Sequence, residues 1–292
     1  MALALEPLND EFVAEARGID LSRPIDAATA AAVEAAMNRH AVLVFRGQPL
    51  DEDQQLAFTR WFGPLDLGLK KVFRAPNRLR HEESIDISNV GLDGKVLARD
   101  SKKMFSNLAN QLWHSDSSFQ QPPAKYSLLS AQVVPPHGGD TEFADMRAAY
   151  DALPDDMKRR IDGLVSEHWA LHSRILLGDT DYTEEEKSII PPVEWPLVRR
   201  HPGSGRRSLF IGVHARRILG MSLPEGRMLL LDLLEHATQP AFVYRHRWRV
   251  GDLVMWDNRC VLHRGRHFDP AVRRELRRST TEDVAWAQGN AA

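Results

Sequence analysis

"NQLWHSDSSF" (residues 110–119) places His114 and Asp116 two residues apart, beside a tryptophan and several small polar side chains. In an extended chain, residues i and i+2 point to the same side, so the imidazole and the carboxylate would converge on one point. Such a pair suits a small cation. A polar turn would hold the same residues, and the pair alone does not decide between the two interpretations.

A third ligand comes from "MWDNRCVLHRG" (255–265), where His263 follows an apolar strand and precedes a glycine turn. Two histidines and one carboxylate on one side of a metal leave three coordination positions open, the arrangement of non-haem Fe(II) oxygenases. The chain has 12 histidines, so several could serve as this ligand. The same ligand types also suit zinc, which leaves a zinc hydrolase as an alternative.

Composition restricts the class of protein. Of the 292 residues, 43% are hydrophobic and 27% charged, which fits a soluble globular protein with a sizeable core. The formal net charge of −2 gives no basic excess for nucleic acid or an anionic membrane. Cys260 is the single cysteine, so an internal disulfide and thiolate metal clusters are excluded. We find no signal peptide and no apolar run of about 18 residues, and we expect a cytoplasmic enzyme.

Hydrophobic periodicity predicts many strands and few helices. We expect helices at 26–40, 51–63, 145–164 (broken near Pro154) and 226–238, and strands at 41–47, 124–136, 208–214, 241–250, 251–258 and 273–280. Two segments with little periodicity, 66–103 and 169–200, are expected to be long loops over the active site. The chain has no repeats or linkers, so we predict a single β-rich α/β domain over residues 1–292, a barrel or sandwich.

The strand "VRRELRRST" (272–280) would place Arg274, Leu276 and Arg278 on one face. A buried arginine needs an anionic partner, and its guanidinium pairs well with a carboxylate. The two arginines lie roughly 13 Å apart at about 3.3 Å per residue, which suits two different anions rather than one. Surface ion pairs are the alternative. The other face is entirely charged and is expected to be solvated; it carries Arg273, Glu275 and Arg277.

The stretch "GGDTEF" (138–143) is a further candidate. Its two glycines would let the backbone approach a neighbouring group closely, and Thr141 offers a hydroxyl donor. A plain turn between the preceding strand and the following helix is the alternative.

Four segments together resemble the taurine dioxygenase superfamily of Fe(II)- and 2-oxoglutarate-dependent oxygenases. They follow the family's order and spacing over nearly the whole chain: "VLVFRGQPL" (42–50), "ANQLWHSDSSFQQP" (109–122), "PPHGGDTEFADMRAAYDALP" (135–154) and "HRWRVGDLVMWDNRCVLHRG" (246–265). Within the superfamily, the chain is most similar to bacterial 2,4-dichlorophenoxyacetate dioxygenases. The resemblance implies a double-stranded β-helix, or jelly roll, with flanking helices. It also implies a homo-oligomer.

The resemblance implies a role for each residue of the metal and cosubstrate sites. His114, Asp116 and His263 would bind Fe(II). Arg274, eleven residues after the last metal histidine, would bind the distal carboxylate of 2-oxoglutarate with help from Thr141. Dioxygen would be the second cosubstrate.

The resemblance also implies a pocket for a small-molecule carboxylic acid. Arg278 would bind its acidic group, and Lys71, Lys95, Ser117 and His214 stand at positions proposed to line the pocket. Solvation is the alternative for the two lysines, and a hydrogen bond to the backbone is the alternative for His214.

The implied reaction hydroxylates the carbon next to the ether oxygen of aryloxyacetates such as 2,4-dichlorophenoxyacetate, giving a phenol, glyoxylate, succinate and CO2. The same chemistry on taurine or another aromatic acid is the nearest alternative. An inactive metal-binding jelly roll that carries or senses an aromatic acid is an alternative of a different class. This chain departs from the family pattern in residues 73–83 and at Arg216 and Arg217, where a second histidine is usual. Both departures would change which acid fits.

Overall fold

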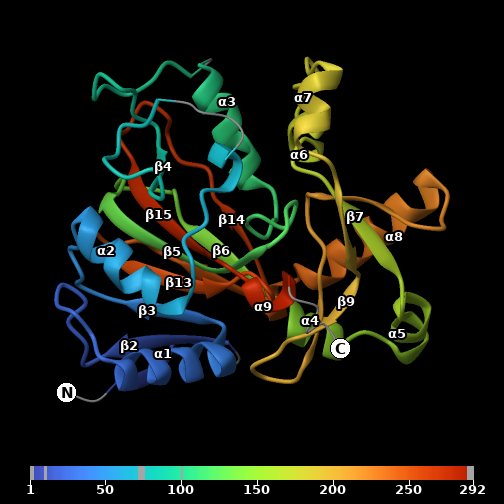
Figure 1. Ribbon diagram of the computed structural model, residues 1–292, viewed down its shortest axis with the longest axis horizontal. Coiled ribbons are helices and arrows are strands. Elements are labelled where there is room, and N and C mark those ends of the chain that lie inside the picture. Colours follow the sequence, from blue (N-terminus) through green and yellow to red (C-terminus); the bar gives the residue numbers. More distant parts are fainter. Residues whose placement is uncertain (1–2, 10–11, 72–75, 100, 288–292) are drawn as a thin grey trace.

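Two facing β-sheets form the centre of the protein, seen in a computed structural model that describes residues 3–9, 12–71, 76–99 and 101–287 (Figure 1). The larger sheet has seven strands, in the order β1 (Ala4–Pro7), β2 (Val13–Arg17), β3 (Val42–Phe45), β13 (Leu253–Asp257), β5 (Ala124–Val133), β15 (Glu275–Glu282) and β4 (Ile85–Ser88). The smaller sheet has three, in the order β12 (Val243–His246), β6 (Thr141–Asp145) and β14 (Val261–Gly265). This arrangement agrees with the predicted jelly roll.

The space between the two sheets is filled by large apolar side chains. Phe143 of β6 lies against Trp256 of β13, with ring centroids 5.5 Å apart, and Val261 and Leu276 belong to the same buried cluster. Every residue of β3 and β13 is buried, because helices cover the opposite face of the larger sheet. Continuous apolar strands of this kind are what the sequence predicted at 41–47 and 251–258.

The covering helices are α1 (Ala27–His40) and α2 (Glu52–Thr59), which run along the outer face of the larger sheet (Figure 1). Asp26 caps α1 by accepting a hydrogen bond from the backbone of Thr29, and Asp51 and Gln54 form a capping box at the start of α2. Both helices begin within a residue of the predicted position. Their buried apolar residues pack on the sheet and hold its first strands in place.

A second group of elements packs at the other end of the protein. Its helices are α4 (Met146–Asp151), α5 (Asp155–Ile161) and α8 (Leu223–Ala237). Its strands are β7 (Val165–His168), β8 (Val193–Pro196), β9 (Val198–Arg200), β10 (Arg207–Leu209) and β11 (Ala215–Ile218). The predicted break near Pro154 is confirmed, since this residue separates α4 from α5. The strand expected at 208–214 ends at Leu209.

The two segments expected to be irregular contain short regular elements. Segment 66–103 holds the 3-10 turn η2 (Gly68–Lys71), strand β4 and the first residues of α3 (Lys102–Leu108). Segment 169–200 holds α6 (His172–Leu176), α7 (Glu184–Ile189), β8 and β9. Helices this short form through packing and have too few residues for a periodic pattern, and β4 forms because it pairs with β15. The single-domain organisation stays a prediction.

One expectation about β15 is wrong. Arg277 and Glu275 do not face solvent: they are 8% and 9% exposed. The reason is that α2 lies across this part of the sheet, so that Arg277 donates hydrogen bonds to the backbone carbonyls of Leu50 and Asp51, each at 2.8 Å. Only Arg273 of this face is exposed.

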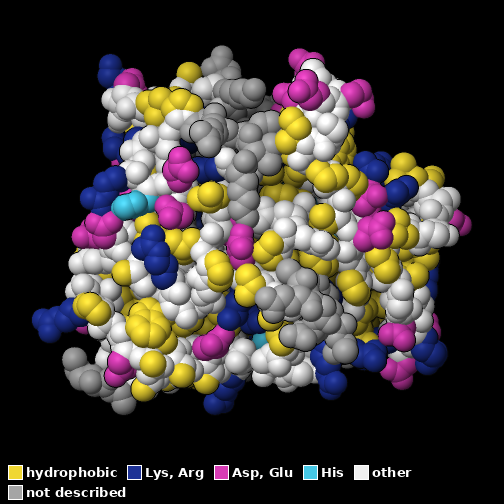
Figure 2. All heavy atoms as spheres, in the orientation of Figure 1, with side chains coloured by type: hydrophobic (Ala, Val, Ile, Leu, Met, Phe, Trp, Pro, Cys, Tyr) yellow, Lys and Arg dark blue, Asp and Glu magenta, His cyan; other side chains and the backbone are white. Residues whose placement is uncertain are grey.

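On the face drawn in Figure 2, basic and acidic side chains are interspersed, in keeping with the small net charge. Among the described helices, none is long and apolar enough to cross a membrane. Localisation and oligomeric state stay predictions.

Candidate active site

The fold brings His114, Asp116 and His263 together, although His263 lies far from the other two in the sequence. His263 lies on β14, and His114 follows the short turn η3 (Ala109–Gln111). The two histidines form an isolated β-bridge, in which each backbone N–H donates to the other residue's carbonyl, at 3.0 and 2.9 Å. This bridge sets their rings side by side, with centroids 4.1 Å apart.

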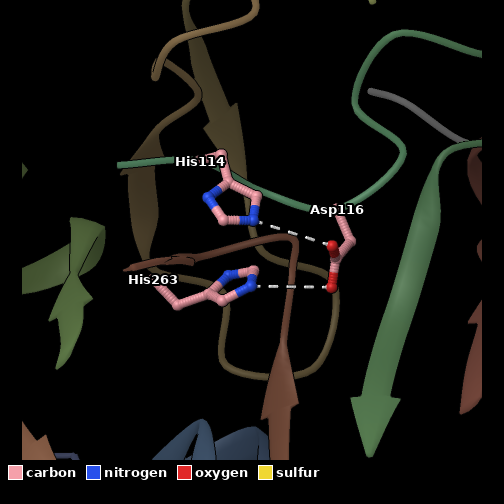
Figure 3. A group of neighbouring side chains, drawn as sticks. All are labelled: His114, Asp116 and His263. Carbon is pink, nitrogen blue, oxygen red and sulfur yellow. Dashed lines mark ion pairs between the residues drawn. The ribbon is translucent and has the colours of Figure 1, made fainter. Parts of the chain in front are cut away.

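The side chains of the triad converge on one point (Figure 3). The Nε2 atoms of His114 and His263 lie 3.9 and 3.7 Å from the two carboxylate oxygens of Asp116. One ligand atom from each residue lies within 4.8 Å of the others, and all three residues are buried. A divalent ion bound at about 2.0–2.2 Å from nitrogen and oxygen ligands fits between atoms spaced in this way.

Both imidazoles are neutral at physiological pH. Burial lowers the pKa of His114 and lowers that of His263 well below its ordinary value, and the nearby carboxylate only partly opposes this. The Nδ1 of His114 lies 2.7 Å from the carbonyl oxygen of Leu112. Since a carbonyl can only accept, Nδ1 carries the proton and Nε2 presents its lone pair toward Asp116. His114 therefore offers a lone pair to a metal from Nε2, and neutral His263, whose Nε2 also faces Asp116, can offer a second.

Asp116 is ionised. Burial would raise its pKa, but the positive charge of Arg278, aided by the hydrogen bond from Ser127, outweighs burial and lowers the pKa to about 2. Ser127 donates to its Oδ2 at 2.7 Å, and Arg278 donates to its Oδ1. The donor set thus fits a divalent metal: two neutral imidazoles and one carboxylate, oriented by hydrogen bonds.

A first cavity, the Arg274 cavity, opens beside the triad and is bordered by His114, His263, Thr141, Arg274 and Arg278. Arg274 is 8% exposed and lies just before β15, where its backbone N–H donates to Asn89 at 2.8 Å. Burial lowers its pKa to about 10, so its guanidinium is positive at physiological pH in a largely desolvated place. Such a cation favours a carboxylate ligand.

The two glycines of "GGDTEF" make close approaches, as predicted. A Cβ atom at Gly138 would lie 2.5 Å from the carbonyl oxygen of His267, and one at Gly139 would lie 3.0 Å from Nε of Arg274. Arg274 also donates from Nη2 to the carbonyl oxygen of Gly139 at 3.0 Å. Thr141 follows at the start of β6, where its hydroxyl accepts a hydrogen bond from the indole of Trp248 at 3.0 Å. This turn therefore fixes the Arg274 guanidinium.

A second cavity, the Lys70 cavity, adjoins the other side of the triad. It shares His114 and Arg278 with the first cavity and is also bordered by Asp116, Ser117 and His214. Ser117 has a left-handed backbone (φ 49°), and its hydroxyl donates to Asp66 at 2.6 Å. The ring of His214 packs edge-on against Phe119, and its Nδ1 has no hydrogen-bond partner among the described residues.

The structure does not bring Lys95 to the site. This lysine is exposed on the turn between Val90 and Val96, which form a β-bridge, and it borders neither cavity. The side chain of Lys71 lies outside the described part of the protein. Sequence reasoning missed three other cations that border the Lys70 cavity: Lys70, Lys103 and Arg174. Lys70 and Lys103 lie in segment 66–103, where several basic residues occur without a period that would rank one lysine above another, and no sequence signal marked Arg174 in segment 169–200.

The departures at Arg216 and Arg217 lie away from both cavities. Both side chains bind the carboxylate of Glu167 on β7, and Arg216 also lies over the ring of Trp169 at 5.0 Å. Neither arginine borders the described part of either cavity.

A second group of potential ligands, His201, Asp257 and Cys260, is buried elsewhere. Both oxygens of Asp257 are engaged by Arg259, at 2.8 and 2.6 Å, and one also lies 2.9 Å from His201. This carboxylate is already neutralised by Arg259, so the group is a structural ion-pair network.

Comparison with known proteins agrees with this geometry. The family model described as "Taurine catabolism dioxygenase TauD, TfdA family" matches residues 4–280. The chain belongs to this family. It is therefore a 2-oxoglutarate-dependent dioxygenase with the jelly-roll core, and the enzyme class and fold expected from the sequence are confirmed.

Two curated relatives are named alpha-ketoglutarate-dependent 2,4-dichlorophenoxyacetate dioxygenase. The protein from Cupriavidus pinatubonensis strain JMP 134 is 61% identical over 285 residues, which are 98% of this chain and 99% of that protein. The protein from Burkholderia sp. strain RASC is 60% identical over 281 residues, 96% of this chain and 95% of that protein. Among solved structures, AAD-2 in complex with Mn(II) and N-oxalylglycine is 51% identical, has a TM-score of 0.90, and is matched over 96% of this chain and 97% of its own.

Proposed function

We propose that this protein is an Fe(II)- and 2-oxoglutarate-dependent dioxygenase that hydroxylates aryloxyacetates, such as 2,4-dichlorophenoxyacetate, at the carbon next to the ether oxygen. The hydroxylated product is a hemiacetal that separates into a phenol and glyoxylate, while 2-oxoglutarate leaves as succinate and CO2. Two relatives that are about three-fifths identical over nearly the whole chain carry this activity in their names.

The observation that carries the proposal is that two cavities meet at one metal triad, and that each contains an arginine. In our proposal His114, Asp116 and His263 hold Fe(II), which, with 2-oxoglutarate and dioxygen bound, supplies the oxidation. Arg274 binds the distal carboxylate of 2-oxoglutarate, next to Thr141. An enzyme that uses one acid to oxidise another needs two separate carboxylate sites beside its metal, whereas a carrier of a single acid needs one.

Arg278 positions the substrate in this proposal. It lies where the two cavities meet and already donates to Asp116. A guanidinium has several N–H groups. The Nε of Arg278 has no partner among the described residues, so Arg278 can bind the substrate carboxylate while it holds Asp116. The carbon beside that carboxylate is then held next to the metal ligands. The apolar ring lies in the Lys70 cavity, in contact with Phe119 and Leu69 at its wall.

The test is to supply the purified protein with Fe(II), 2-oxoglutarate and dioxygen, together with either 2,4-dichlorophenoxyacetate or taurine. We expect phenol, glyoxylate and succinate in equal amounts with the first acid, no turnover with the second, and complete loss of activity after a chelator removes the metal. Succinate with taurine alone would contradict the proposed substrate and reassign the Lys70 cavity.

The variant Arg278→Met tests the division of roles between the two arginines. We expect the KM for the aryloxyacetate to rise by a factor of at least about thirty, corresponding to roughly 2 kcal/mol, the lower end of the cost of truncating a buried charged partner. The KM for the cosubstrate should rise much less. Because Arg278 also holds Asp116, metal affinity is measured in parallel. An equal rise in both KM values would contradict the assignment.

A further inference from the structure

The Lys70 cavity carries more positive than negative charge. Among its described lining residues, four are cationic and two are carboxylates; the cations are Lys70, Lys103, Arg174 and Arg278, and the carboxylates are Asp86 and Asp116. An apolar ring with one carboxylate would balance one of these cations. The cavity therefore has more cationic groups than the proposed substrate uses.

Three of the four cations are already engaged. Lys103 donates to Asp86 at 2.9 Å, and Arg278 donates to Asp116. Lys70 donates from Nζ to two backbone carbonyls, those of Glu82 and Ser84, at 3.0 and 2.7 Å, which pins its side chain to the wall of the cavity.

Arg174 is the exception. It lies on α6 and is half-buried, and among the described residues its side chain makes one hydrogen bond, from Nη1 to the carbonyl oxygen of Ala170 at 3.2 Å. It forms no ion pair with any carboxylate in the part of the chain that the structure describes. Arg278 borders both cavities, whereas Arg174 borders only the Lys70 cavity, so it stands away from the end where the substrate carboxylate binds.

The position of Arg174 exposes its charge to whatever fills the cavity. It borders the same cavity as His214 and is only half-buried. A guanidinium has five N–H donors in a planar fork, and one of them is used by Ala170. The remaining donors can take a carboxylate in the bidentate geometry that arginine favours.

We propose that Arg174 is a specificity-determining residue that binds a second carboxylate on the ring of the substrate. The preferred substrate class is then a ring-carboxylated aryloxyacetate, a dianion whose acetate group binds Arg278 and whose ring carboxylate binds Arg174. This inference rests on the proposed function, because it assumes that an aryloxyacetate occupies the Lys70 cavity.

The test compares 3- and 4-carboxyphenoxyacetate with the corresponding methylphenoxyacetates, using the enzyme supplied with Fe(II) and 2-oxoglutarate. The measured quantity is the ratio of kcat/KM for the carboxy substrate to kcat/KM for its methyl counterpart. We expect this ratio to fall about tenfold in Arg174→Met, a moderate value for a charge-assisted hydrogen bond in a half-buried place. Arg174→Lys, which keeps the charge, should recover part of the loss. Arg227→Met, an exposed arginine on α8, is the matched control and should leave the ratio at its wild-type value.

A binding measurement on the wild-type protein does not depend on how the variants fold. Protein loaded with Mn(II) and N-oxalylglycine is titrated with each acid at two salt concentrations. We expect added salt to weaken binding of the dianion more than binding of the methyl compound.

The outcomes separate the two proposals. If wild-type enzyme oxidises methylphenoxyacetates but the ratio is the same in Arg174→Met, the role of Arg174 is refuted and the proposed function stands. If the salt dependence of the two acids is equal, the role of Arg174 is also refuted. If no aryloxyacetate yields a phenol, the proposed function fails and this inference fails with it.

Discussion

Replacing Gly139 with alanine tests whether Arg274 binds 2-oxoglutarate. Gly139 has a φ of +73°, and an added Cβ would lie 3.0 Å from Nε of Arg274, 3.2 Å from its Cδ and 3.1 Å from Cγ of Pro135. The substitution therefore has two effects. It strains the backbone, and it presses on a guanidinium that we assign to the distal carboxylate of the cosubstrate.

The two effects have different magnitudes and different readouts. A left-handed alanine costs about 1–2 kcal/mol of unfolding free energy. Truncating a buried charged partner costs roughly 2–5 kcal/mol of binding, and displacing it by a few tenths of an ångström costs part of that. We take the loss as about 1.4 kcal/mol, which corresponds to a tenfold weaker affinity for the cosubstrate. The KM for the aryloxyacetate should change less than threefold or so, since Arg278 is untouched.

Gly205→Ala is a matched control. Gly205 has a φ of +69°, and an added Cβ there meets no heavy atom within 4 Å. It should have the same cost in stability and no effect on cosubstrate binding. The assay is anaerobic titration of the metal-loaded protein with 2-oxoglutarate, alongside denaturant unfolding of both variants. Equal Kd values of the two variants for 2-oxoglutarate, whether raised or not, would refute the assignment of Arg274 to the cosubstrate.

Two further predictions concern buried charged side chains away from the metal. Arg277→Met should lower the unfolding free energy by about 2–3 kcal/mol in denaturant titrations, because it removes charged hydrogen bonds to the start of α2. The exposed control Arg273→Met should lower the unfolding free energy by less than about 1 kcal/mol. Equal losses in the two variants would count against the role of Arg277. Asp257→Asn tests pH dependence: burial opposes ionisation, but Arg259 and His201 hold the pKa of Asp257 far below its ordinary value. The ion pair of Asp257 with Arg259 therefore stabilises the fold above about pH 4, and this stabilisation is lost as the pH falls below that value. The Asp257→Asn variant should be roughly 3 kcal/mol less stable than wild type at pH 7. Between pH 4 and 2 its unfolding free energy should fall less than that of wild type. Parallel acid titration curves for the two proteins would contradict this.

Most of the candidate metal triad could be proposed from the sequence because its chemistry is local. His114 and Asp116 are two residues apart in the sequence, although Asp116 begins a turn rather than continuing an extended strand, and His263 was marked by the strand before it and the glycine after it. The β-bridge that places His263 beside His114 was not predictable, because it joins residues far apart in the sequence. The local pattern singled out His263 among 12 histidines, and the resemblance to a known family supported that choice.

The lysines show where prediction from the sequence fails. Lys70, Lys71 and Lys95 lie in a segment with no period to say which side chains point inward. Lys95 is exposed on a turn, while Lys70 borders the cavity, because η2 is held there by the hydrogen bond from Gly68 to the buried Asp66. That anchor is a tertiary contact, so spacing within the segment carries no trace of it.

Arg277 and Arg278 are neighbours on β15 and have opposite surroundings. The alternation of a strand predicted correctly that they point to opposite faces of the sheet, and it predicted that one face lines a site. It also led to the expectation that the other face meets water, because charged side chains usually do. What overturned that expectation is the segment that leads into α2, more than two hundred residues earlier in the chain. It covers Arg277, whose guanidinium donates to the backbone carbonyls of Leu50 and Asp51. Local pattern thus tells which residues share a face, and only the fold tells what covers it.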